Sequence, residues 1–136
     1  MLEKIEKDGI LYAIVIRHTY KPEATEFFTP KSNSLQLGFI KHERGYEDKP
    51  HVHRSSGKII QDKQEVLQLL GGRVAFDIYT RDGKPVATTI LEKGDTILLV
   101  SGAHRYRALE DFWGLMVKQG PYVSIEDDKE FLEMKE

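Results

Sequence analysis

The sequence has 136 residues, of which 40% are hydrophobic and 31% are charged, which is enough apolar material for the core of one domain. Acidic and basic residues are interspersed, giving a formal net charge of −2, and there is no cysteine. Nucleic acid is therefore not expected as a partner, and disulfides and thiolate metal ligands are excluded. Residues 1–8 are charged and lack a long apolar run, so we expect neither a signal peptide nor a membrane span. We therefore expect a soluble, cytoplasmic protein.

The first half of the chain predicts strands separated by an irregular connection. Residues 9–17 form a β-branched and aromatic run that is typical of a strand. Residues 19–33 contain prolines and clustered Ser, Thr and Asn, which indicate a connection with a turn or short strand at residues 26–28. Residues 34–41 resume as a strand. Pro50 favours the start of another strand over a helix interior.

The second half of the chain repeats short strands at intervals of about ten residues. Asp82-Gly83 between two such segments is a strong hairpin signal. Only residues 126–136 have a helical pattern. Regular short strands with turns at this spacing predict an all-β sandwich or barrel. The predicted strands cover residues 65–70, 73–80, 85–91, 96–100, 106–109, 113–119 and 123–125.

The tripeptide His51-Val52-His53 predicts a metal site. On an extended strand, alternate side chains share a face, so His51 and His53 would point the same way, as two ligands of one ion must. Glu65 begins an apolar strand, and its carboxylate is expected to point inward, where an unpaired charge needs a cation. His104, after a predicted turn, is the fourth candidate ligand.

Each candidate has a simpler alternative. His51 and His53 could be solvated surface residues, Glu65 could be paired with a basic side chain, and His104 could be a turn histidine bonded to the backbone. The two remaining candidates for imidazole ligands, His18 and His42, are expected at the surface or in loops.

These residues resemble the two signatures of the cupin superfamily. The first signature runs Gly, five residues, His-x-His, a short gap, Glu, six residues, Gly. Here Gly45, His51-Val52-His53, Glu65 and Gly72 follow it, with a longer gap before Glu65. The second signature is met in part by a segment that begins at Gly94 and ends at His104, with Val100 at the usual proline position and one residue fewer before the histidine.

The resemblance implies a single small cupin domain over residues 1–136, folded as an antiparallel jelly-roll β-barrel with a short C-terminal helix. It also implies one divalent ion held by His51, His53, Glu65 and His104. Nitrogen and oxygen donors without thiolate suit Fe, Mn, Ni, Zn, Co or Cu. Four protein ligands leave positions for water or substrate, as in a catalytic site.

Three functions are compatible with this resemblance. The first is a metal-dependent enzyme that isomerises or dioxygenates a small polar metabolite, either carbohydrate-derived or acidic. The second is a non-catalytic protein that binds or senses a small molecule. The third is a metal-free protein, like the deoxysugar-nucleotide epimerases, that uses a His and Tyr acid/base pair on the same barrel.

The sequence also suggests partners. The strand Ile10 to Ile16 is long for an unpaired edge, so we expect a homodimer that shares it. Arg105, Arg107 and Lys118 could meet an anionic substrate near the mouth of the barrel, or could be solvated strand residues. A small molecule is the expected ligand, and neither nucleic acid nor a membrane is expected as a partner.

Overall fold

The computed structural model describes residues 1–54, 60, 62–120 and 124–133. The chain divides into two compact units. The larger unit comprises Met1–Tyr20 and Asp62–Glu136, and the smaller unit comprises Lys21–Gln61. The single cupin domain over residues 1–136 stays a prediction.

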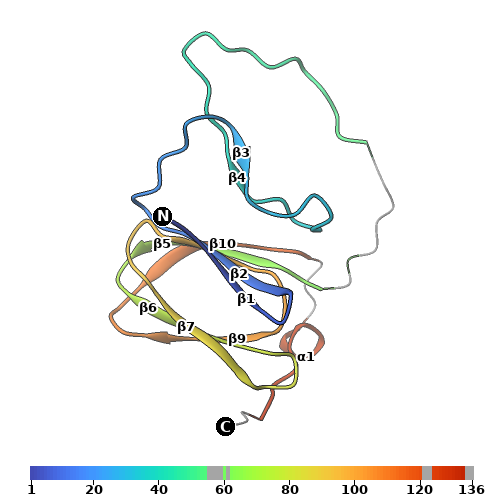
Figure 1. The fold of residues 1–136 in the computed structure, drawn as a ribbon, viewed down its shortest axis with the longest axis vertical. Helices are drawn as coiled ribbons and strands as arrows, with labels where there is room; N and C mark the ends of the chain where they lie inside the picture. Colours follow the sequence, from blue (N-terminus) through green and yellow to red (C-terminus); the bar gives the residue numbers. More distant parts are fainter. Residues whose placement is uncertain (55–59, 61, 121–123, 134–136) are drawn as a thin grey trace. The chain divides into compact units, whose positions relative to one another are not determined.

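The larger unit contains two antiparallel sheets, which Figure 1 shows facing each other. The strand order of one sheet is β1-β2-β8-β5-β10, and that of the other is β7-β6-β9. The all-β prediction is confirmed, and the arrangement is consistent with a β-sandwich. The described strands do not close into a barrel, so the jelly roll stays a prediction. The strands are β1 (Leu2–Lys7), β2 (Ile10–Ile16), β5 (Glu65–Gly71), β6 (Val74–Tyr79), β7 (Pro85–Leu91), β8 (Thr96–Leu99), β9 (Ala103–Ala108) and β10 (Trp113–Lys118).

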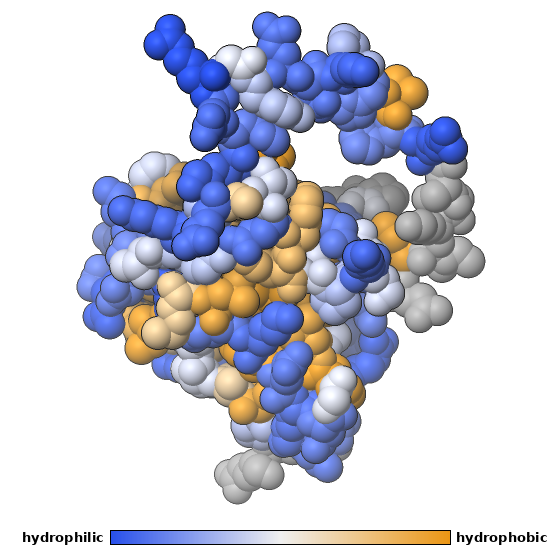
Figure 2. All heavy atoms as spheres, turned by 45° about the horizontal axis from the view of Figure 1, so that its top comes forward, coloured by the Kyte–Doolittle hydropathy of each residue, from blue (hydrophilic) through white to orange (hydrophobic). Residues whose placement is uncertain are grey.

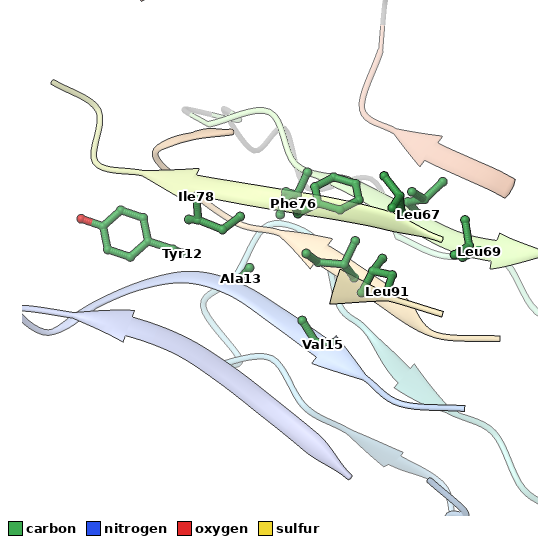
Figure 3. Packing of buried hydrophobic residues seen from close by; sticks show 11 residues of the cluster. Tyr12, Ala13, Val15, Leu67, Leu69, Phe76, Ile78 and Leu91 are labelled. Atoms are coloured by element: carbon green, nitrogen blue, oxygen red, sulfur yellow. The ribbon is translucent and has the colours of Figure 1, made fainter. Parts of the chain in front are cut away.

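The facing sides of the two sheets share one hydrophobic core. Because side chains alternate along a strand, Val74, Phe76 and Ile78 of β6 all point inward. They meet Leu67 and Leu69 of β5, and Figure 3 shows these side chains between the strands. Burial of such apolar side chains contributes about 2 kcal/mol each to folding. The rest of the core consists of Tyr12, Ala13, Val15, Leu91, Ile97 and Leu99.

Strand β1 was not expected, because its sequence is mostly charged. It pairs with β2 through a two-residue turn at Asp8 and Gly9, whose φ angles are 53° and 76°. This geometry matches the tight hairpin turns that Asp-Gly favours. As a result β2 is paired on both sides, with β1 and β8, so the argument for a dimer through an unpaired edge at Ile10–Ile16 is wrong.

The edge strand β10 exposes large hydrophobic side chains. Trp113, Leu115 and Val117 alternate along it and are all more than half exposed. Figure 2 shows hydrophobic residues exposed between hydrophilic ones on the face in view. Contiguous exposed apolar side chains are typical of surfaces that bind a partner.

The smaller unit contains one short hairpin, in which β3 (Glu26–Phe27) pairs with β4 (Gly38–Phe39). The rings of Phe28 and Phe39 pack edge to face, with centroids 6.0 Å apart. The strand expected over residues 34–41 is therefore shorter than predicted. The strand expected from Pro50 to His53 is wrong, because these residues pair with no strand and Nδ1 of His51 makes a local contact with the carbonyl of Lys49 at 2.8 Å.

The C-terminal helix is a single turn, α1 (Ile125–Asp128), closed by a hydrogen bond from the N–H of Lys129 to the carbonyl of Ile125 at 2.8 Å. Residues 129–133 are not helical, so the helix predicted over residues 126–136 is wrong in extent. Short helices are unstable without tertiary packing, because nucleation is costly. The strand predicted at residues 123–125 is wrong at Ile125, which begins α1. Residue 123 and residues 134–136 lie outside the described residues. No described helix is both long and apolar enough to cross a bilayer.

Candidate functional site

The carboxylate of Glu65 lies at the start of β5, on the side of the strand that faces the second sheet. Leu67 and Leu69 follow it on the same face and belong to the core. Glu65 therefore points between the sheets, as predicted, and its side chain is 17% exposed.

His104 reaches the same place from the other sheet. It lies opposite Ile78 in the register of β6 and β9, and because Ile78 points into the core, His104 does too. Its Nε2 is 3.4 Å from Oε2 of Glu65. The alternative of a turn histidine is wrong, because β9 begins at Ala103 and includes His104.

A basic side chain, Lys118, is the third member of this cluster. Lys118 on β10 is in register with Glu65 on β5, so the two side chains lie on the same face. The Nζ of Lys118 is 3.8 Å from Oε1 of Glu65, on the opposite side of the carboxylate from His104. The alternative of a Glu65 carboxylate paired with a basic side chain is therefore confirmed, and the register of β5 and β10 makes Lys118 that partner.

The pKa of Glu65 is lowered, chiefly because the imidazole of His104 hydrogen-bonds to the carboxylate. Partial burial acts in the opposite direction, and attraction from His104 and Lys118 reinforces the lowering. Glu65 is consequently ionised at neutral pH. An inward-facing carboxylate beside an imidazole is suited either to binding a cation or to orienting a general base.

Gly102 places His104 at the start of β9. Its φ is +75°, in the left-handed region that favours glycine, and a Cβ there would overlap the carbonyl oxygen of Tyr79 and the ring of Tyr12. Gly102 therefore allows the chain to pass close to both tyrosines just before the strand that carries the imidazole. This gives a physical reason for glycine at position 102.

The two histidines of the first signature belong to the smaller unit. The rings of His51 and His53 are 5.2 Å apart between centroids, and both residues are exposed. Oδ2 of Asp48 lies 3.5 Å from Nδ1 of His51. The structure thus brings Glu65 and His104 together in one unit and His51 and His53 together in the other. Among the residues that the structure describes, no three His, Asp or Glu side chains converge as metal ligands.

The other two histidines lie outside this cluster, in the loops where they were expected. His18 follows β2, and its Nδ1 is 2.9 Å from Oδ1 of Asp95. His42 is exposed in the smaller unit, where its ring stacks on that of Tyr46 with centroids 3.7 Å apart.

Asp95 is a buried carboxylate that the sequence reasoning did not identify. It lies in the turn between β7 and β8 and is 1% exposed. Its Oδ2 accepts hydrogen bonds from Nη1 of Arg17 at 2.9 Å and from the N–H of Glu92 at 3.0 Å. The N–H of His18 donates to Oδ1 at 2.8 Å. Burial alone would raise the pKa of Asp95, but these hydrogen bonds together lower it, so the residue is a structural anion.

Arg105 and Arg107 lie on the opposite face of β9 from His104. Both donate to the carboxylate of Asp77 on the outer side of the sheet. They therefore do not line the space around Glu65. The sequence contains a clue to this pairing, because an aspartate interrupts the apolar run of β6 and two arginines alternate along β9. The register that brings β6 and β9 together could not be known from the sequence.

The donor set at Glu65 and His104 fits a first-row transition metal. It offers one carboxylate and one imidazole and no thiolate, and Oε2 of Glu65 faces Nε2 of His104. Lys118 binds the other carboxylate oxygen, so Oε2 is the oxygen that would face an ion.

Comparisons of the chain with models of protein families, with curated proteins and with solved structures give no match.

Proposed function

We propose that this chain is a divalent-metal-binding cupin, in which His51, His53, Glu65 and His104 hold one transition-metal ion inside a jelly-roll barrel. One observation carries the proposal: Glu65 and His104, which belong to different signatures, meet at 3.4 Å between the sheets. Such convergence of distant residues is what a shared ion requires. The proposal further requires His51 and His53 to approach the same point.

We propose that the protein is an enzyme that isomerises or dioxygenates a small polar metabolite, either carbohydrate-derived or acidic. The ion would supply Lewis acidity or, if it is redox-active, a site for dioxygen. Lys118 would stabilise a negative charge on the substrate next to Glu65, because its ammonium group lies at the same carboxylate. Tyr106 follows His104 on the same face and packs against Phe76 and Phe112, so it would form part of the wall.

The metal-free alternative is favoured by one specific feature. A carboxylate beside an imidazole fixes the orientation of a general base, and Glu65 and His104 have this arrangement. Tyr106 on the same face of β9 would then be the acid, as in the His and Tyr pair of the epimerase-like class. In the binding or sensing alternative, Glu65 and His104 would bind a small molecule without turnover.

We also propose a homodimer, but with a different surface from the one that the sequence suggested. The exposed residues Trp113, Leu115 and Val117 of the edge strand β10 would supply the interface. A small molecule is the proposed ligand of the site between the sheets.

Metal analysis tests the proposal. The full chain, produced with ample metals and desalted at neutral pH, should contain about one transition-metal ion per chain. The double variant His51→Ala with His53→Ala should lose the metal and keep its circular dichroism spectrum. The control His42→Ala, which removes another exposed imidazole of the smaller unit, should retain it.

Two results would contradict the metal site: a metal-free wild-type protein, or full metal content in the double variant. The first of these would favour the acid/base alternative. Oxygen uptake and product formation with a panel of small polar metabolites then distinguish an enzyme from a protein that only binds.

A further inference from the structure

A second cluster of charged residues lies on the outer face of the three-stranded sheet, around Asp77. Its neighbours along β6 point into the core, so Asp77 points outward, yet it is only 5% exposed. Its Oδ2 accepts hydrogen bonds from Nε of Arg105 and Nε of Arg107, both at 2.8 Å. Its Oδ1 accepts from Nη2 of Arg107 at 3.0 Å and from the hydroxyl of Thr88 at 2.7 Å.

These contacts leave positive charge and hydrogen-bond donors unused. One arginine neutralises Asp77, so the second guanidinium is in excess. The side chains of Arg105 and Arg107 are 58% and 49% exposed. Arg105 contributes only its Nε to the carboxylate, and within the described chain its terminal amino groups donate to no acceptor. They are thus held in a fixed orientation with free donors, which is the feature that lets arginine bind oxyanions.

The guanidinium groups border a depression of about 320 Å³ between β7 and β9. Pro85 and Val86 line it on the β7 side, and Tyr79 lies beside Arg105, whose Cζ is 6.0 Å from the ring centroid. The depression therefore combines cationic donors with a small apolar and aromatic wall. This composition suits a small molecule that carries an oxyanion on a carbon skeleton.

We propose that Arg105 and Arg107, braced by Asp77, form a binding site for the oxyanion group of a small molecule on the outer face of the β7-β6-β9 sheet. Phosphate and carboxylate share this chemistry, because both accept paired N–H donors from a guanidinium. The site is separate from the proposed metal site, since Arg105 and His104 lie on opposite faces of β9. It does not depend on the proposed function.

The alternative is that both arginines serve only to neutralise Asp77. That role explains the Nε contacts, but one arginine with two hydrogen bonds, as Arg107 makes, already supplies the counter-charge. This alternative does not explain why a second, exposed arginine borders the depression. An oxyanion would use the donors that Asp77 does not.

Nuclear magnetic resonance of the full chain tests the proposal. The probes are inorganic phosphate and acetate, added at constant ionic strength while the Nε–H signals of the arginines are followed. We expect saturable shifts at Arg105 and Arg107 with at least one probe, and the probe that saturates identifies the oxyanion. Arg105→Gln should weaken that binding about tenfold or more, because it removes charge-assisted hydrogen bonds.

Arg81→Gln is the matched control. Arg81 is 87% exposed in the hairpin between β6 and β7 and is not part of the depression, so its loss removes the same charge elsewhere. It should change the affinity by less than about twofold, as expected for a screened surface charge. The proposal is overturned if neither probe gives saturable shifts, or if Arg81→Gln weakens binding as much as Arg105→Gln does.

Discussion

The carboxylate of Glu65 on β5 and the imidazole of His104 on β9 meet between two different sheets, with Oε2 and Nε2 3.4 Å apart. The two residues are far apart in the sequence, and the position of each depends on the strand that carries it. Glu65 is placed by its alternation with the core leucines of β5, and His104 is placed by its pairing with Ile78. A site built on strands rather than on loops is held in position by the core beneath it.

Gly102→Ala should displace the strand that carries His104. A Cβ at this position overlaps the carbonyl oxygen of Tyr79, so we expect a loss of at least about 2 kcal/mol in the free energy of unfolding. Gly45→Ala is the comparison, because Gly45 also has a positive φ, of +95°, but has open space around it. It should lose only about 1 kcal/mol, from backbone strain alone. Urea denaturation measures both, and equal losses would contradict the steric argument.

Asp95→Asn should destabilise the protein by about 3 kcal/mol, because it removes a buried negative charge that pairs with Arg17, alongside Glu3, and one of the two acceptor oxygens for backbone N–H groups. Glu92→Gln is the matched control. The Glu92 side chain is 58% exposed and lies 3.8 Å from Arg73, and such surface pairs contribute less than about 1 kcal/mol. If the two variants unfolded at the same urea concentration, Asp95 would not have the structural role that its contacts indicate.

Stability should depend on the ionisation of Asp77. Hydrogen bonds from Arg107, the largest effect, and from Arg105 and Thr88 hold the pKa of Asp77 far below its usual range, although burial opposes them. A lowered pKa in the folded state means that the carboxylate stabilises the protein above its ordinary pKa of about 4. This contribution is lost as the pH falls from there toward the folded pKa.

The measurement is the free energy of unfolding from about pH 6 to pH 2 for the wild type and for Asp77→Asn. The wild type should lose stability more steeply below about pH 4, because the variant has no carboxylate at this position. Parallel curves over the whole range would show that the ion pairs of Asp77 do not contribute.

The sequence predicted the strands whose patterns are local. Residues 73–80 and 85–91 were predicted as a hairpin with Asp82-Gly83 at its turn, and β6 and β7 agree with this. Strand β1 was not predicted, because it is mostly charged and lacks the apolar pattern of a strand. Asp8-Gly9, however, has the same hairpin sequence as Asp82-Gly83. The strand predicted at Pro50–His53 failed because a strand needs a partner, which no local pattern supplies.

Part of the candidate site could also be predicted. The spacing of Glu65 ahead of two core leucines indicated an inward carboxylate, and the second signature pointed to His104. The contact of Lys118 with Glu65, and that of Arg105 with Asp77, could not be predicted, because each depends on which strands pair and in what register. That information is set by the assembled sheets rather than by any one segment.

Electron paramagnetic resonance of the Cu²⁺-loaded full chain tests the central claim most directly, because coupling to imidazole nitrogen counts the histidine ligands of the ion. The proposal predicts coupling to three imidazoles in the wild type, one fewer in His104→Ala, and two fewer in the double variant His51→Ala with His53→Ala. A wild-type signal that neither His104→Ala nor the double variant alters would show that the ion binds elsewhere and would contradict the proposed site.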